Sequence, residues 1–382
     1  MKKLLSIILA ICVMLTSSIT AFAAEEETSD KVMRQIEGAI AYLTKDVESY
    51  GVDSAIDFSI IADSGADVSK FADAFIADVK ANLDANGGKI VSSYGENLST
   101  YAAVIIALFN FHVDPADFRG YDITKAFLAM DPTVEPVSPN YYRIITSALM
   151  FCDDSDKFLE AVCDTYISSY YTMGKGVDYY GFSCDNTAYF IDAIAIGNFA
   201  LKKYKDVLDD ALKVLDTYKV DGGYCFNPEY GTEPNANSTA LALMAHSAYT
   251  DGPQESHSYF DLLNGIYADL CAFESTTTGV FTYDGDESAY TTKEALIALS
   301  YYYLDALIQE IFEDVPEDEE PTTDGTEKAE PIKAKNPTTA STTKADTSKK
   351  SPATGVDVTA VSASIALFAA AGVLAVLKKK EK

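Results

Sequence analysis

The sequence has no tryptophan, only three histidines, and 29 basic side chains against 58 acidic ones. The net charge of −29 repels nucleic acid and anionic lipid, so we expect no nucleic-acid partner. It contains no P-loop, dinucleotide-binding fingerprint or nucleophile elbow. No stretch alternates apolar and polar residues with period two for long enough to predict a sheet. We therefore assign no catalytic residue and expect no cofactor.

Cysteine is also sparse. One of the six cysteines, Cys12, lies in an N-terminal segment that we expect to be removed. The remaining five cannot all pair with one another, and none belongs to a CxxC motif. We expect buried free thiols, with one or two disulfides as the alternative. The five are Cys152, Cys163, Cys184, Cys225 and Cys271.

The N-terminus has the pattern of a secretory signal peptide. A charged start at Met1 to Lys3 precedes an apolar stretch, and Ala21-Phe22-Ala23 supplies the small residues of a cleavage site. We assign residues 1–23 to this signal and predict cleavage after Ala23. The alternative is a retained membrane anchor, which the short apolar stretch disfavours.

The C-terminus combines a short motif, an apolar span and a basic tail. Ser351-Pro352-Ala353-Thr354-Gly355 precedes the uncharged run 358–377, which is long enough to cross a bilayer, and four lysines follow. Residues 351–382 resemble the cell-wall sorting signal of Gram-positive bacteria. The resemblance implies that a sortase joins Thr354 to peptidoglycan and that a membrane is contacted only before sorting. Ser351 stands where that family usually has leucine. The alternative is a plain membrane anchor.

Between this signal and the body of the chain, residues 313–350 are predicted to be a disordered, wall-spanning linker. The segment is acidic at first and then rich in Thr, Lys, Pro and Ala. It has too few apolar residues to bury a core.

The body, residues 24–312, repeats one unit, which is clearest at 221–249. A glycine turn and an aromatic loop lead into an amphipathic helix, for which 237–239 offer capping oxygens. We find five such cycles. The helix-start threonines Thr187, Thr239 and Thr292 are 52 and 53 residues apart. Repeated helical pairs of this length predict an all-α solenoid or a closed ring.

Two segments carry a resemblance to a known family. Gly222-Gly223-Tyr224 with 238–243 is similar to the prenyltransferase and squalene-oxidase repeats of α/α-toroid proteins. The run 99–108, with the turns at 114–115 and 120–122, resembles the toroid domains that clostridial relatives export. The resemblance covers about residues 32 to 310. It implies an α/α toroid, a barrel of repeated helical hairpins, and says little about function.

The enzymes of that family suggest two chemistries, and the sequence supports neither. Asp221, Cys225 and His246 supply the residue types of a prenyltransferase zinc site without its spacing, so we expect no metal. The catalytic acid of a terpene cyclase needs a crowded carboxylate cluster that raises its pKa. The acidic clusters 153–156 and 284–287 lie in predicted surface turns and do not provide such a site. Tryptophans of the kind that brace triterpene cyclases are absent.

Aromatic clusters precede several of the predicted helices. If the ring closes, these loops gather at one end and line a cavity mouth suited to a glycan, a planar cofactor or a peptide. The candidate rim residues are Tyr180, Phe182, Tyr224, Phe226, Tyr230, Asn235, Asn237, Phe281 and Tyr283. Alternatively, the aromatics only plug gaps between helices.

The resulting hypothesis is an exported, wall-anchored protein that binds an unknown extracellular small molecule, glycan or partner protein. A terpene-cyclase or prenyltransferase-type enzyme and a structural spacer are the alternatives.

Overall fold

The computed structural model describes residues 28–136, 138–249 and 257–313. The predicted signal peptide, sorting motif and C-terminal span lie outside these residues, as does almost all of the linker. Within them, no helix is long and apolar enough to cross a membrane. The last helix ends at Glu313, next to the predicted end of the body at residue 312.

The described residues alternate between an outer and an inner helix six times, and the prediction of an all-α body is confirmed. The outer helices are α2 (Thr28–Thr44), α4 (Ala72–Ala85), α6 (Ile123–Leu128), α8 (Asp156–Tyr170), α10 (Lys205–Asp216) and α12 (His257–Cys271). The inner helices are α3 (Ala55–Ala62), α5 (Leu98–Asn110), α7 (Tyr142–Leu149), α9 (Cys184–Leu201), α11 (Ala236–Ala248) and α13 (Ala289–Glu313). Four 3₁₀ turns lie at Val52–Ser54, Ser69–Phe71, Pro115–Asp117 and Pro139–Tyr141.

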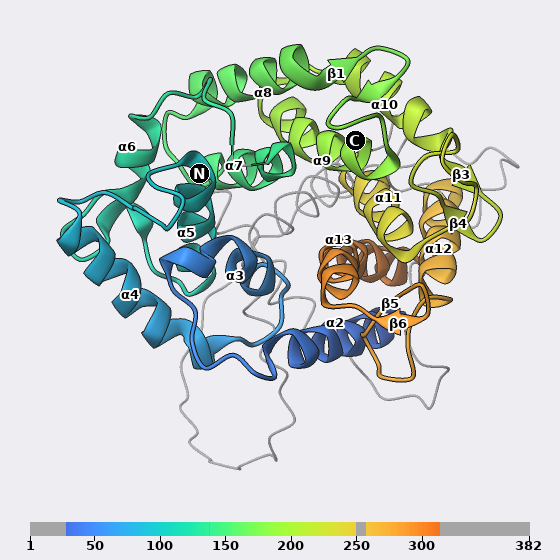
Figure 1. Cartoon of the computed structure of the whole chain (residues 1–382), viewed down its shortest axis with the longest axis horizontal. Coiled ribbons are helices and arrows are strands. Elements are labelled where there is room, and N and C mark those ends of the chain that lie inside the picture. The colour runs from blue at the N-terminus through green and yellow to red at the C-terminus, as the bar shows by residue number, and fades with distance from the viewer. Residues whose placement is uncertain (1–27, 137, 250–256, 314–382) are drawn as a thin grey trace, which may run out of the picture.

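The inner helices form a closed ring. Each packs against the next in chain order, and α13 returns to contact α3. The outer helix α2, at the start of the described chain, packs along α13, so the two ends of the fold lie side by side (Figure 1). Because every inner helix follows an outer one, all six enter the ring in the same direction, and their N-termini gather at one end.

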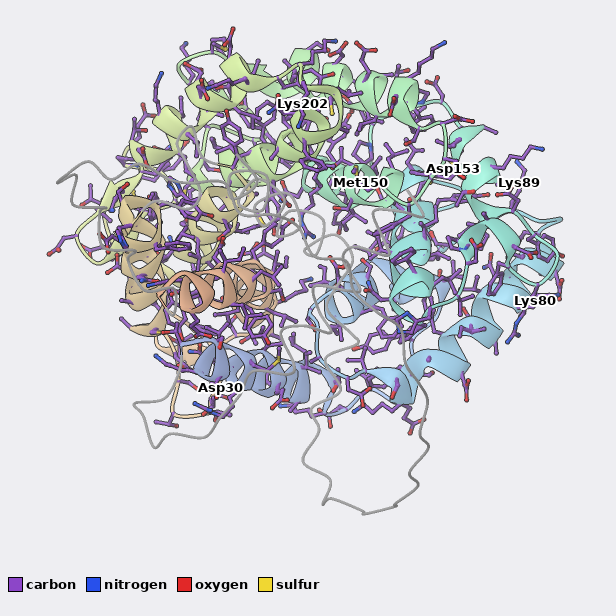
Figure 2. All side chains as sticks on the ribbon, turned by 180° about the vertical axis from the view of Figure 1, so that it is seen from behind. Asp30, Lys80, Lys89, Met150, Asp153 and Lys202 are labelled. Atoms are coloured by element: carbon purple, nitrogen blue, oxygen red, sulfur yellow. The ribbon has the colours of Figure 1, made fainter. Side chains whose placement is uncertain are left out.

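Side-chain pattern decides which layer a helix joins. Every residue of α11 is buried, as expected for a helix with neighbours on all sides. The outer helix α10 buries one stripe, formed by Leu208, Ala211, Leu212, Val214 and Leu215, and presents its charged residues to solvent. Figure 2 shows Lys80 and Lys89 at the outer edge of the ring, where such charges stay hydrated.

Short antiparallel hairpins precede three inner helices. They pair β1 (Tyr171–Thr172) with β2 (Gly176–Val177), β3 (Lys219–Val220) with β4 (Gly223–Tyr224), and β5 (Thr282–Tyr283) with β6 (Asp286–Glu287). The aligned threonines hold two of these connections: the amide of Tyr224 donates to Oγ1 of Thr239, and the amide of Phe281 donates to Oγ1 of Thr292, both at 3.0 Å. The regular spacing of Thr239 and Thr292 therefore corresponds to a hydrogen bond that is repeated between a hairpin and the helix that follows it.

One detail of the repeat differs from the prediction. The cap of α11 is Asn235, whose side chain accepts a hydrogen bond from the amide of Ser238 at 2.9 Å. The predicted capping residues 237–239 lie inside the helix. The reason is that Asn235 has an extended backbone, which places its side chain over the first helical turn.

Candidate functional site

Five tyrosines lie at or just before the N-terminal ends of four inner helices, α5, α7, α9 and α13. Tyr141 lies close enough to Tyr94, Tyr179 and Tyr290 to interact with each electrostatically. The ring of Tyr180 is 4.5 Å from that of Tyr179, between centroids. We call this set (Tyr94, Tyr141, Tyr179, Tyr180 and Tyr290) the tyrosine mouth. Tyr94, Tyr180 and Tyr290 are 69%, 94% and 58% exposed, so their ring faces are accessible to a ligand.

Tyr180 is held in a costly backbone conformation. Its φ is 55°, in the left-handed region that a bulky residue rarely adopts. Hydrogen bonds fix the turn around it: Nδ2 of Asn186 donates to the carbonyls of Tyr179 and Gly181 at 3.0 and 3.3 Å. A strained and fully exposed aromatic gains no stability from burial, which makes Tyr180 a candidate for ligand contact.

Glu294 lies beneath the mouth in a network that joins three inner helices. It is 1% exposed, and Tyr189 of α9 donates to its Oε1 at 3.1 Å. Asn237 of α11 donates to its Oε2 and in turn accepts a bond from Thr291 at 2.9 Å. Burial raises the pKa of Glu294 above its ordinary value. A protonated carboxyl here could donate a hydrogen bond to a ligand as well as accept one.

Asp185, in the first turn of α9, is the second carboxyl of the floor. Oγ of Ser238 donates to its Oδ1 at 2.7 Å. Burial, together with the nearby charge of Glu294, raises the pKa of Asp185 to about 7. Nζ of Lys293 lies 2.8 Å from Oδ1 of Asp57, so this lysine of α13 is already paired with another carboxylate. We therefore expect Asp185 and Glu294 to bind uncharged ligand groups, or to share a proton with them, near neutral pH.

The raised carboxyl pKa values predict that the ring is less stable above pH 7 than in mildly acidic solution. Burial raises the pKa of Asp305, on α13, to about 7, as it does for Asp185. The folded protein then binds more protons than the unfolded chain between about pH 4 and 7, so stability is lost as pH rises through that range. We expect urea unfolding to give a free energy lower at pH 8 than at pH 5 by about 2 kcal/mol per such group.

Asp305→Asn tests this because an amide cannot ionise. It should flatten the pH profile, whereas Asp221→Asn, at an exposed position, should leave the slope unchanged. Equal stability of the parent protein at pH 5 and pH 8 would show that these carboxyls are not held protonated by the fold.

A buried ion pair crosses the ring centre, deeper along the axis than Glu294. Nε of Arg143, on α7, lies 2.9 Å from Oδ2 of Asp192 on α9, and Tyr301 of α13 donates to Oδ1 of the same carboxylate at 2.7 Å. Asp192 is fully buried and Arg143 is 7% exposed. The pair and its tyrosine tie three inner helices together across the axis.

The predicted rim residues do not share one environment. Tyr224 and Phe281 are fully buried, where they anchor the hairpin connections, so they form no part of an exposed rim. Asn235 caps α11, and Asn237, 6% exposed, belongs to the carboxyl floor. Phe182 is partly buried. The exposed members are Tyr180, Phe226, Tyr230 and Tyr283, and the Tyr230 hydroxyl lies beside Gly181, next to the mouth.

Sequence reasoning missed most of the mouth. Tyr94, Tyr141 and Tyr290 each directly precede or begin an inner helix, which is the position that the aromatic-loop argument singled out. Asp185 and Glu294 are separated by more than one hundred residues and look like ordinary members of an acidic chain. Their pairing becomes visible only when the ring closes.

The five cysteines in the part of the chain that the structure describes are free thiols, as predicted. Four are buried and Cys271 is partly so, and burial raises the pKa of the Cys152 thiol to about 12. Nε2 of the buried His246 lies 3.2 Å from the hydroxyl of Tyr224. Among residues 28–136, 138–249 and 257–313, no three His, Cys, Asp or Glu side chains are grouped as a metal site.

Comparison with known proteins gives a likeness in structure and none in sequence. No family model and no curated protein matches the sequence. A solved polysaccharide lyase matches the structure with a TM-score of 0.50 at 14% identity, over 76% of this chain and 100% of the other. At this identity the match supports the helical, toroid-like fold and carries no statement about activity.

Proposed function

We propose that the tyrosine mouth binds a glycan. The observation that carries this proposal is the group of tyrosines at the N-terminal ends of the inner helices, three of them exposed, with Tyr180 94% exposed on a strained turn. Flat aromatic faces pack against the C–H faces of sugar rings, while neighbouring polar groups satisfy the hydroxyls. Asp185, Glu294 and Asn237 supply those polar groups below the mouth.

The structural neighbour is consistent with this class of ligand. It is a polysaccharide lyase, and so acts on a polysaccharide. The two proteins share a fold at low sequence identity, so we use the neighbour only as a suggestion of the ligand class and infer no activity from it.

We further propose that the chain is exported and displayed on the wall of a Gram-positive bacterium. Residues 1–23 would direct export, and a sortase would join Thr354 of the sorting motif to peptidoglycan. On this proposal the ring is an α/α toroid of the prenyltransferase-repeat type, held away from the wall by the linker. A protein placed there meets glycans continually, which agrees with the proposed ligand.

Glycan binding is tested by applying the purified protein to an array of bacterial wall and plant polysaccharides. We expect retention of at least one glycan, and loss of about tenfold in affinity for Tyr180→Ala combined with Tyr290→Ala, because central aromatic contacts dominate binding energy. Tyr42→Ala, on the outer helix α2, is the matched control. The same samples are analysed for shortened polysaccharide chains, since two carboxyl groups, one of them protonated, are also what glycan cleavage requires.

Unchanged affinity in the double variant would place binding elsewhere. Retention of no glycan by the parent protein would overturn the proposal.

A further inference from the structure

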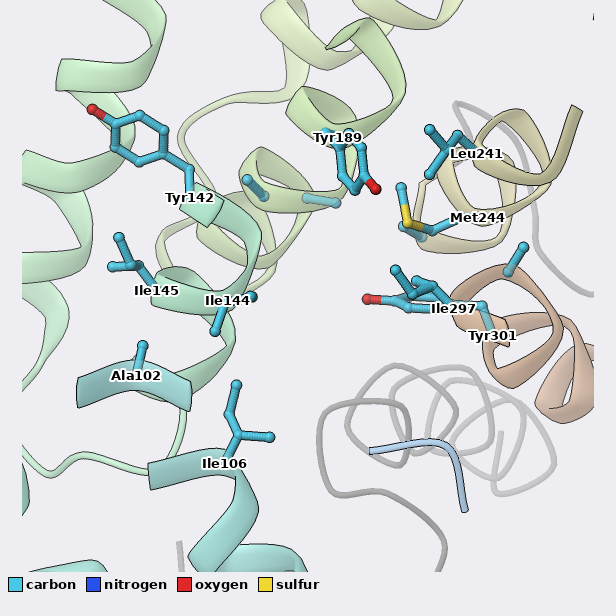
Figure 3. Close-up of a cluster of buried hydrophobic side chains, with 14 of the residues drawn as sticks. Ala102, Ile106, Tyr142, Ile144, Ile145, Tyr189, Leu241, Met244, Ile297 and Tyr301 are labelled. Atoms are coloured by element: carbon cyan, nitrogen blue, oxygen red, sulfur yellow. The ribbon is translucent and has the colours of Figure 1, made fainter. Parts of the chain in front are cut away.

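Within the residues that the structure describes, the interior of the ring is too tightly filled to admit a sugar chain. Glu294 and Asn237 of the floor are 1% and 6% exposed, and their hydrogen bond joins α13 to α11. Deeper in the ring, a cavity lined in part by Ile106, Ile144 and Ile297 holds about one water molecule. Figure 3 shows Ile106 and Ile144 facing Ile297 across this centre. A glycan chain bound at the mouth must therefore lie across the end of the ring.

A second pair of exposed aromatic side chains lies beside the mouth. Tyr230 and Phe226, in the loop before α11, are 76% and 45% exposed. A Cβ added at Gly181 would lie 3.8 Å from the hydroxyl oxygen of Tyr230, and Gly181 directly follows the exposed Tyr180. The aromatic surface of the mouth therefore continues onto the neighbouring connection. We call the tyrosine mouth together with Phe226 and Tyr230 the aromatic platform.

Hydrogen bonds hold the two loops of the platform against each other. Nδ2 of Asn227 donates to the carbonyl of Phe182 at 2.8 Å. The amide of Cys184 donates to the carbonyl of Phe226 at 2.9 Å. Within the second loop, the amide of Tyr230 donates to the carbonyl of Asn227 at 2.9 Å. Because the loops are fixed before a ligand arrives, less entropy is lost on binding.

The charges of these loops decide what kind of chain fits. Residues 178–186 and 225–236 contain no lysine, arginine or histidine, and their four acidic residues are Asp178, Asp185, Glu229 and Glu233. A polysaccharide of uronic acids would be repelled by them, whereas an uncharged chain would not. The tyrosine rings offer flat apolar faces, which match the C–H faces that each sugar unit presents along a chain.

We propose that the aromatic platform binds the interior of an uncharged polysaccharide chain, with successive sugar units lying over the mouth and over Tyr230 and Phe226. The proposal rests on the proposed function in one respect, that the mouth binds a glycan. It goes further in extending the site onto the loop before α11. It also assigns recognition to a stretch of the chain, and not to the chain end.

The probe is the polysaccharide that the array of wall and plant glycans retains most strongly, cut by limited hydrolysis into fragments of two and six sugar units. Affinities are measured by calorimetry on the purified full chain. We expect the six-unit fragment to bind at least about tenfold more tightly, because it reaches a second set of aromatic contacts.

Tyr230→Ala should remove most of this difference and leave the affinity for the two-unit fragment at the mouth unchanged. Because the Tyr230 side chain is largely exposed, the variant should keep the urea midpoint of the parent protein, which is checked first. Tyr42→Ala, on the outer helix α2, is the matched control and should leave both affinities unchanged.

The outcomes separate this proposal from glycan binding at the mouth. Equal affinity of the parent protein for the two fragments overturns the platform, and retention of the polysaccharide by the same protein leaves the mouth proposal intact. An unchanged affinity of folded Tyr230→Ala for the six-unit fragment also overturns the platform, as does retention of uronic-acid polysaccharides in place of uncharged ones. Retention of no glycan overturns both.

Discussion

Replacing Arg143 by alanine is expected to destabilise the protein by about 3–5 kcal/mol, because it leaves a buried carboxylate without its cation. Asp192 is fully buried, and Tyr301 would then be its one remaining partner among the hydrogen bonds found in the described chain. The effect should appear as a lower urea midpoint with an unchanged slope, since the ring would still unfold as a unit.

Two controls separate charge compensation from general damage. Lys203→Ala removes an exposed lysine that pairs with Glu160 and Asp164 on the outer helix α8, and should leave the urea midpoint almost unchanged. Arg143→Met combined with Asp192→Leu replaces the pair by apolar side chains and should recover most of the lost stability. A loss of under 1 kcal/mol in Arg143→Ala would mean that solvent reaches Asp192 and that the pair does not hold the ring centre together.

The helical class and the repeat could be predicted because they depend on local pattern. The stripe on α10 and the glycine turn before α11 are visible within about thirty residues. The threonine period also proved informative, since Thr239 and Thr292 make the same bond in successive units. Each of these features lies within one helical pair, where the spacing of residues along the sequence determines which side chains share a helix face or a turn.

The first inner helix, α3, was missed for a physical reason. The stretch Ala55–Ala62 has eight residues and is apolar on nearly every side, so it has no stripe that would mark an amphipathic helix. It is stabilised by packing between α5 and α13. This omission explains why the sequence predicts five cycles while the structure has six helical pairs.

The site was only partly predictable because it is built across the ring. The rule that aromatics gather before inner helices singles out Tyr180, which the structure shows to be exposed. It could not separate Tyr180, 94% exposed, from Tyr224, which has the same kind of sequence context and is fully buried. Burial depends on whether the aromatic faces the axis or the wedge between two helices, and that direction is set by tertiary packing.

Substituting alanine at Gly279 is expected to be as damaging as the loss of Arg143, because it would open the ring at its seam. An added Cβ at Gly279 would lie 2.0 Å from the carbonyl oxygen of Gln35 and 2.6 Å from the amide nitrogen of Ala39, both in the backbone of α2. The φ of Gly279 is also +77°, which disfavours any side chain. Across the contact, a Cβ at Gly38 would lie 2.0 Å from the carbonyl oxygen of Thr278.

The two glycines therefore let the loop before α13 touch the backbone of α2, where the last unit of the ring meets the first. Overpacking and backbone strain together should cost about 3–5 kcal/mol in Gly279→Ala, measured by urea unfolding. Gly265→Ala, at an exposed helical position with open space around it, should instead stabilise by about 0.5–1 kcal/mol. If Gly279→Ala unfolded with an unchanged free energy, α2 could move away from the loop at no cost in stability. The close contact between the two would then not be needed to close the ring.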